Sequence, residues 1–330
     1  MEAPVGASGA LEPPGETEAD EGGAMPPLEE AWDGADEQAD AALPERALVA
    51  SSPRTLLGEH LGAWLELGLT AGGPESESVT GVTTELGLRY RMADAVVADV
   101  SWGLVIARTR VVDEEMVGGS AIAYDRKITR VEPGNPVLRG AFTHPFEDVA
   151  RLEVGLGVAV PSAARAQAGV DADTLAERRA SEVAHRAALA MRGYWSPWRF
   201  APERLGLILP VRLAFALDAL TVDAQVVFGV MVPVLGGRGQ DADVVVQGAA
   251  GVGGRVVGPL HLGARLRAVG AASGVIVPDA LVVSAEPWVR LRFDPVQIAL
   301  RSSLVLNGTD GLGQARGPGF GLFLSGGVEL

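Results

Sequence analysis

Residues 204–234 read RLGLILPVRLAFALDALTVDAQVVFGVMVPV, and apolar side chains occupy every second position through most of this stretch. Alternation with a period of two is typical of β-strands, because successive side chains point to opposite faces of the sheet. One face carries Arg212, Asp223 and Gln225, while leucine, valine and phenylalanine form the other. The stretch therefore predicts two antiparallel strands, 204–218 and 221–234, joined by a tight turn.

The same two-faced alternation recurs ten more times between about Leu61 and Leu330. The twelve expected strands cover residues 61–71, 79–91, 95–108, 135–144, 147–160, 204–218, 221–234, 241–256, 258–270, 281–293, 295–306 and 319–330. The connections alternate between short and long, as in barrels that cross a membrane. Charged residues share a face with glycine, and the other face is uniformly apolar. We therefore predict an all-β fold, a transmembrane antiparallel up-and-down β-barrel of about 12 strands over residues 57–330, whose apolar face meets lipid.

From about residue 60 to residue 330, the chain resembles porin-like, single-chain β-barrels of the Gram-negative outer membrane. The last strand keeps the alternation of that class through Phe320, Leu322, Leu324 and Val328, although Leu330 stands where the class usually has an aromatic residue. The resemblance implies insertion among outer-membrane lipids by the barrel-assembly machinery, with the N-terminal tail and the C-terminus in the periplasm.

The N-terminal region differs in composition from the rest. Residues 1–59 hold 14 of the 42 acidic residues but only 2 of the 27 basic ones, so most of the net charge of −15 lies there. Residues 1–56 show no sustained period and are predicted to be a disordered, acidic periplasmic tail. The tail is expected to be solvated, or else to be a segment that docks on a periplasmic partner or plugs the barrel. The start, MEAP, lacks the features of a signal peptide, so we expect that one has been removed from the native chain.

Several functional classes lack support in the composition. The chain is 48% hydrophobic and has a mean hydropathy of +0.21. Even so, no run of apolar residues approaches the length of roughly 18 residues that a membrane helix needs. The absence of cysteine excludes disulfides and thiolate metal sites, and no basic stripe suggests nucleic-acid binding. The four histidines stand singly, and His261 lacks the nearby serine of outer-membrane phospholipases. We therefore expect no metal, no cofactor and no enzymatic activity.

The charged residues that alternate with the apolar face are the candidates for lining the lumen. An arginine facing hydrocarbon at mid-depth would cost about 2–4 kcal/mol, whereas a wet lumen keeps it hydrated or paired. The candidates are Glu66, Glu85, Arg89, Asp99, Arg151, Glu153, Arg212, Asp223, Arg255, Arg265, Arg267, Glu286, Arg290, Arg292 and Arg301. The five arginines from 265 to 301 have few acidic neighbours in sequence. They form either an anion-favouring pore wall or part of a salt-bridged lumen that holds the barrel together, and the second interpretation is simpler.

The longest connection, 162–203, is expected to be an outer loop that contains a helix. Thr174 and Glu177 have the spacing of a capping box, and Gly193 would end the helix. The densest aromatic cluster of the chain follows, and its members are assigned to the barrel mouth: Tyr194, Trp195, Trp198 and Phe200. The loop either folds over or into the mouth, or packs on the rim with its aromatics at the membrane interface. The rim is the simpler interpretation.

Two functions fit this sequence. The first is an outer-membrane channel for passive or selective passage of small solutes, anionic ones if the arginines dominate the lumen. The second is a non-conducting outer-membrane barrel that presents surface loops, or anchors a partner through its loops or its N-terminal tail.

Overall fold

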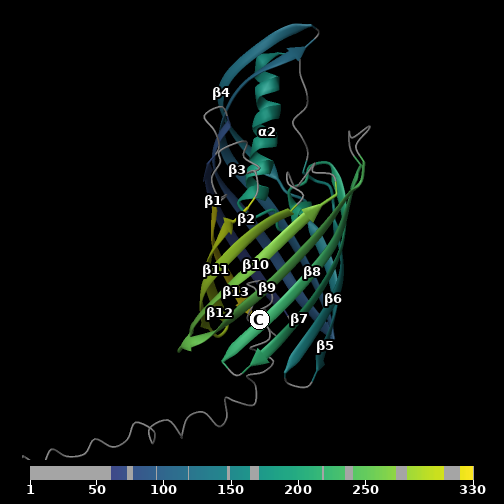
Figure 1. Cartoon of the computed structure of the whole chain (residues 1–330), viewed down its shortest axis with the longest axis vertical. Coiled ribbons are helices and arrows are strands. Elements are labelled where there is room, and N and C mark those ends of the chain that lie inside the picture. The colour runs from purple at the N-terminus through teal and green to yellow at the C-terminus, as the bar shows by residue number, and fades with distance from the viewer. Residues whose placement is uncertain are drawn as a thin grey trace, which may run out of the picture. The chain divides into compact units, whose positions relative to one another are not determined.

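The computed structural model describes residues 61–72, 77–93, 95–117, 119–146, 149–163, 171–217, 219–234, 241–272, 281–307 and 320–329. The predicted tail, 1–56, lies outside the described residues. Among those described, thirteen antiparallel strands form one sheet (Figure 1). They are β1 (Leu61–Gly72), β2 (Glu77–Ala93), β3 (Val96–Val117), β4 (Ser120–Pro133), β5 (Val137–Phe146), β6 (Ala150–Ala159), β7 (Arg204–Leu217), β8 (Leu220–Pro233), β9 (Asp243–Val257), β10 (Leu260–Ala271), β11 (Leu281–Phe293), β12 (Val296–Val305) and β13 (Phe320–Glu329).

Twelve of these strands close into a barrel, and they are the twelve that the sequence predicts. Each pairs with its neighbours in chain order, β1 pairs with β13, and β2 pairs with β3, so the sheet returns on itself. Closure matters because it leaves no unpaired backbone edge around the barrel, which is the condition for a sheet to exist in hydrocarbon.

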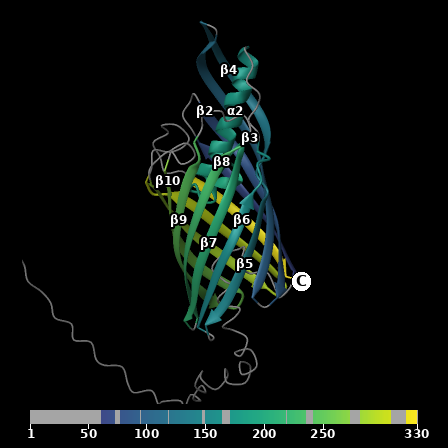
Figure 2. The same ribbon diagram turned by 90° about the vertical axis from the view of Figure 1, so that its right-hand side faces the viewer.

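The thirteenth strand, β4, was not predicted, because residues 109–134 were assigned to a loop. Instead, β3 runs on past the barrel and turns back as β4. The lower part of β3, Val96–Ser101, pairs with β5, whereas Leu104–Val117 pair with β4. The resulting hairpin projects beyond one end of the barrel (Figures 1 and 2).

The polarity of the two faces of the barrel is the reverse of that in a soluble protein: apolar side chains lie outside and charged ones inside. Leu86, Leu156 and Leu266 on the outer face are 55%, 65% and 56% exposed. The inward Glu85 and Arg290 are 1% and 2% exposed. Exposed apolar side chains recur on every strand of the barrel, and so large an apolar surface would be unusual on a soluble monomer. The predicted assignment of the apolar face to the outside of the barrel is therefore confirmed.

Aromatic residues mark one edge of this apolar surface. Tyr90, Phe146 and Phe293 are about half exposed, and each lies next to a short turn at the same end of the barrel. Such rings are typical of the boundary between hydrocarbon and headgroups. No helix among the described residues has the length and apolarity needed to cross a membrane.

The predicted helix in the long connection is present as α2 (Ala172–Ala190), but its predicted cap is wrong. Asp171 is the capping residue, and its carboxylate accepts hydrogen bonds from the backbone N–H groups of Asp173 and Thr174, at 3.1 and 2.9 Å. These bonds favour the charged form, so they lower the pKa of Asp171. Glu177 forms an ion pair with Arg130 instead of closing a capping box.

The small apolar side chains of α2 determine where the helix lies. Leu175, Val183 and Ala187 are almost completely buried, in one cluster with Val111 of β3 and Tyr124 of β4. The helix thus covers the inner face of the projecting hairpin and runs down toward the barrel (Figures 1 and 2). It ends at Ala190, close to Gly193, whose φ of +58° supports the predicted stop.

Candidate functional site: a segment inserted in the lumen

The chain after α2 enters the barrel. Every residue from Met191 to Phe200 is buried, and we call this segment the plug. Its path is tightly coiled: Gly193, Tyr194 and Ser196 have φ angles of +58°, +57° and +58°, and a short 3-10 helix, η3 (Pro197–Arg199), follows. A non-glycine residue in the left-handed region costs about 1 kcal/mol or more, so the surrounding contacts must impose this conformation on Tyr194 and Ser196.

Wall residues from all around the barrel contact the plug. A Cβ atom at Gly68 of β1 would come within 2.7 Å of Met191, and one at Gly103 of β3 within 2.9 Å of Phe200. On another side, a Cβ at Gly206 of β7 or at Gly229 of β8 would lie 3.0 Å from Trp198. Glycine at these positions therefore makes room for the plug. Because the contacts involve β1, β3, β7 and β8, the plug spans the lumen rather than lying on its rim.

The four aromatic residues assigned to the mouth are thus inside the barrel. The exposed fractions of Tyr194, Trp195, Trp198 and Phe200 are 2%, 9%, 5% and 0%. The interpretation that placed them at the membrane interface is wrong, and the interpretation that folds the loop into the mouth describes their position. The physical reason is that Phe200 packs against Gly103 of the wall. Because glycine has no side chain, it leaves a space that the ring fills, and the space would stay empty if the ring faced lipid.

One buried asparagine clamps both ends of this connection. The Nδ2 atom of Asn135 donates to the carbonyl oxygens of Trp198 and Ala201, both at 2.8 Å. Its Oδ1 atom accepts from the backbone N–H groups of Ser162 and Ala163, at 2.9 and 2.8 Å. The entrance and the exit of the long connection are therefore held together at one point on the wall, next to the plug.

Two arginines attach the plug to neighbouring carboxylates. Glu66 of β1 and Glu85 of β2 face each other directly in the strand register. Arg192 lies 2.8 Å from Glu66 and 3.3 Å from Glu85, and Arg199 lies 2.5 Å from Glu85. Carboxylates directly opposite on adjacent strands repel each other, so these guanidinium groups offset a charge arrangement that would otherwise destabilise the wall. Arg301 of β12 also binds Glu66.

The remaining ion pairs link one part of the wall to another. Arg265 lies 2.7 Å from Asp223 and Arg267 lies 2.6 Å from Glu286, to which Arg301 also binds. A second network joins Arg139 to Asp99 at 2.7 Å and to Glu153 at 3.5 Å, and Arg89 also lies 3.5 Å from Glu153. Arg265, Arg267 and Arg301 have few acidic neighbours in sequence, but acidic residues on other strands pair with all three, as in a salt-bridged lumen.

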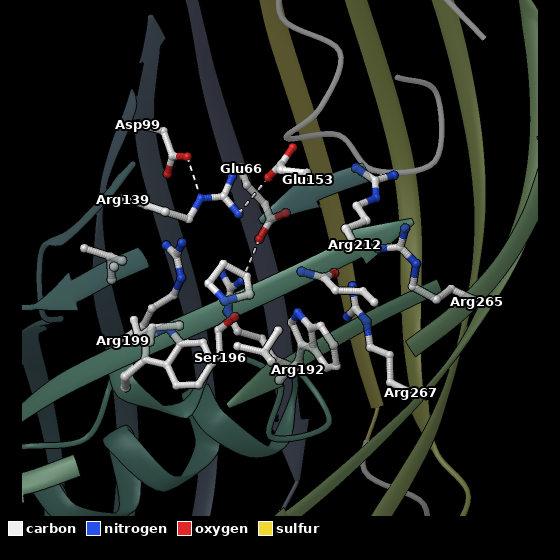
Figure 3. A pocket seen from close by; sticks show the side chains of 18 of the residues that line it. Glu66, Asp99, Arg139, Glu153, Arg192, Ser196, Arg199, Arg212, Arg265 and Arg267 are labelled. Carbon is white, nitrogen blue, oxygen red and sulfur yellow. Dashed lines mark hydrogen bonds and ion pairs between the residues drawn. The ribbon is translucent and has the colours of Figure 1, made fainter. Parts of the chain in front are cut away.

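A cavity of about 100 Å³ lies beside the plug (Figure 3). It has room for a few water molecules. Three acidic residues line it: Glu66, Asp99 and Glu153. Seven arginines line it as well: Arg139, Arg192, Arg199, Arg212, Arg265, Arg267 and Arg301. Its wall is therefore rich in arginine, and each of the seven forms an ion pair with a carboxylate.

The predicted lumen residues are not all brought to this cavity. The exception to burial is Arg255, which is exposed near a short turn and donates from Nε to the carbonyl oxygen of Gly258 at 3.0 Å. The other fourteen are buried or partly buried on the inner face. Arg290, which stacks on Trp288 at 4.6 Å, and the partly buried Arg151 and Arg292 do not line the cavity.

The sequence reasoning missed several residues of the site, namely Asn135, Arg139, Arg192 and Arg199. The two plug arginines were detectable in principle, because Arg192 lies two residues before the aromatic cluster that was singled out and Arg199 lies within it. Among the described residues, no group of three or more histidine and acidic side chains is arranged to hold a metal ion.

No protein-family model matches the chain, and no curated protein does either. Among solved structures, it is similar to the COG4313 outer membrane channel from Pseudomonas putida F1, with 14% identity and a TM-score of 0.52 over 82% of this chain and 95% of that one. It is also similar to the NanC porin, with 8% identity and a TM-score of 0.50 over 81% of this chain and all of that one. At these identities the similarity shows the fold alone, which is that of outer-membrane β-barrels.

Proposed function

We propose that the protein is an outer-membrane channel for small anionic solutes whose lumen is closed at rest by the plug. The observation that carries this proposal is the combination of an apolar outer face with an arginine-rich cavity that ends against a buried segment. The outer face suits hydrocarbon. The arginines provide a favourable potential for anions, and removal of the plug would connect the cavity to the outside.

The proposed orientation places the short turns in the periplasm. Glu329 near the C-terminus pairs with Gly62 at the start of β1, and Gly62 pairs with Arg89, which lies close to the turn between β2 and β3. The first and the last residues of the barrel's chain are thus both on the side of the short turns, which supports a periplasmic N-terminal tail and C-terminus. Insertion by the barrel-assembly machinery and docking of the tail on a periplasmic partner belong to the same proposal. No enzymatic step is involved.

The second candidate is a non-conducting barrel that presents its loops or anchors a partner. Two observations favour it: ion pairs and close packing hold the plug, and the hairpin of β3 and β4 projects beyond the barrel together with α2. The two candidates differ in whether the plug ever leaves the lumen.

Ion selectivity tests the anionic part of the proposal. We expect chloride to permeate more readily than potassium in planar bilayers. Replacing both Arg265→Gln and Arg267→Gln should shift the reversal potential in a KCl gradient toward cation selectivity, because Asp223 and Glu286 then keep their negative charge with fewer cations beside them. The matched control is Arg126→Gln, an exposed arginine outside the lumen that pairs with Asp173.

The experiment is best done both in the full chain and in a variant lacking residues 165–200, so that gating and selectivity are separated. Cation selectivity of the unaltered lumen would contradict the anionic proposal. Absence of current in both forms would favour the non-conducting barrel.

A further inference from the structure

The outer face of β3 changes character at one position. Trp102 and Ile106 point outward and are exposed, whereas the next two outward residues are Arg108 and Arg110. The partner strand β4 changes at the same level. Ile106 pairs with Val131, the next outward pair is Arg108 with Thr129, and the one after it is Arg110 with Lys127. The apolar surface thus ends abruptly on both strands and cationic residues follow.

The length of the apolar part places this change at the surface of a bilayer. Ten residues separate Val96, the first outward apolar residue of β3, from Ile106. At a rise of about 3.3 Å per residue and a tilt of about 45°, they span about 23 Å, which is close to the height of about 25 Å of the apolar band of such barrels. Arg108 therefore lies at the level of the lipid headgroups, at the end of the barrel opposite the short turns.

Two of the three cations of this patch lack an ion-pair partner among the residues that the structure describes. Arg110 and Lys127 are direct cross-strand partners, an arrangement that is destabilising on its own. Asp125 pairs with Arg110, at 3.2 and 2.9 Å from Nε and Nη2, and this bond lowers the pKa of Asp125. Arg108 and Lys127 are exposed and form no ion pair with any described residue.

Hydroxyl groups extend the patch on the neighbouring strand. In the register of β2 with β3, Thr80 pairs with Arg108 and Ser78 pairs with Arg110. Guanidinium, ammonium and hydroxyl groups together are the donors that proteins use for phosphate oxygens. Directly below them, Trp102, Ile106 and Val131 offer exposed apolar surface on which acyl chains can lie.

We propose that Arg108, Arg110 and Lys127 form a binding site for the phosphate groups of an anionic lipid in the leaflet at the long-loop end. The ligand is a lipid rather than a free phosphate, because the cations adjoin the apolar band. The proposal rests on the membrane location within the proposed function, but it does not depend on conduction through the lumen.

Lipid retention tests the site directly. The full chain is folded in a neutral detergent and titrated with lipid A that carries two phosphates, or with the same lipid A after dephosphorylation, and bound lipid is counted by native mass spectrometry. We expect retention of the phosphorylated form only. The double variant Arg108→Gln, Lys127→Gln should bind it about tenfold more weakly, which corresponds to about 1.4 kcal/mol.

The matched control is Arg126→Gln, which removes a cation next to Lys127 in sequence but on the opposite face of β4, and it should bind as the unaltered chain does. Different gel mobility before and after boiling verifies that each variant is folded. Equal binding by the double variant, an equal loss in the control, or equal competition by inorganic pyrophosphate would each overturn the proposal. Lipid retention without any ion current would support the lipid site and contradict only the proposal that the protein is a channel.

Discussion

Removing residues 165–200 is expected to raise the single-channel conductance by about tenfold or more. The plug contacts the wall on several sides, and the cavity beside it holds only about 100 Å³. A bare barrel of twelve strands is wider than filled barrels of eight and narrower than open porins of sixteen, so an unobstructed lumen should pass small ions. Planar-bilayer recordings of the two proteins measure the difference.

The structure makes this deletion practical. The backbone N–H of Glu203 donates to the carbonyl oxygen of Ala163 at 2.8 Å, so the two ends of the excised segment are neighbours that a short glycine–serine linker can join. The deletion also uncovers Val111 and Tyr124, against which α2 packs. A second variant therefore keeps α2 and replaces Trp195, Trp198 and Phe200 by glycine, and its conductance should rise by a smaller factor. Unchanged conductance in both folded variants would contradict a plug.

The second large effect is expected from the double variant Glu66→Gln, Glu85→Gln. It leaves Arg192 and Arg199 in the lumen without the carboxylates that they bind. Removing one side of a buried ion pair costs about 3–5 kcal/mol, because the remaining charge is not compensated. Of the two partners in these ion pairs, the glutamates belong to strands of the wall and the arginines belong to the plug, which is not part of the sheet. We therefore expect the plug to leave the lumen and the time-averaged current to increase.

Thiol labelling reports the position of the plug independently of current. The chain has no cysteine, so Ser196→Cys provides a single reactive site in a residue that is 6% exposed. Labelling by a water-soluble maleimide should be slow in the unaltered background and at least about tenfold faster with both glutamates replaced. Asp223→Asn is the matched control, since Asp223 pairs with Arg212 and Arg265 on the wall and not with the plug. Equal labelling rates in all three backgrounds would argue against a role for Glu66 and Glu85 in holding the plug.

The barrel could be predicted from the sequence because a bilayer enforces one pattern on every strand. Outward positions such as Leu86, Leu156 and Leu266 must be apolar along the whole span, so the period of two is strong. Beyond the apolar band this constraint ends. Arg108, Arg110 and Lys127 then occupy outward positions, and the alternation that would have revealed β4 disappears.

The arrangement inside the lumen was much less predictable. Arg301 and Glu66 are 235 residues apart in sequence, and Arg265 and Asp223 are 42 residues apart, so the composition near each arginine says little about its partner. The aromatic residues from Tyr194 to Phe200 suit a membrane interface as well as a packed lumen. The burial of these rings, together with the ion pairs of Arg192 and Arg199 with Glu66 and Glu85, distinguishes the two positions.

A disulfide between the plug and the wall tests the closed lumen most directly. A Cβ atom at Gly206 of β7 would lie 3.0 Å from the Cβ atom of Trp198, so the variant Trp198→Cys, Gly206→Cys places the only two thiols of the chain together. In the full chain reconstituted into bilayers, mild oxidation should join them within one molecule and hold the current at its closed level, and a reductant should release it. A folded protein that forms no such disulfide, and that conducts as an open pore before any residue is removed, would contradict the account.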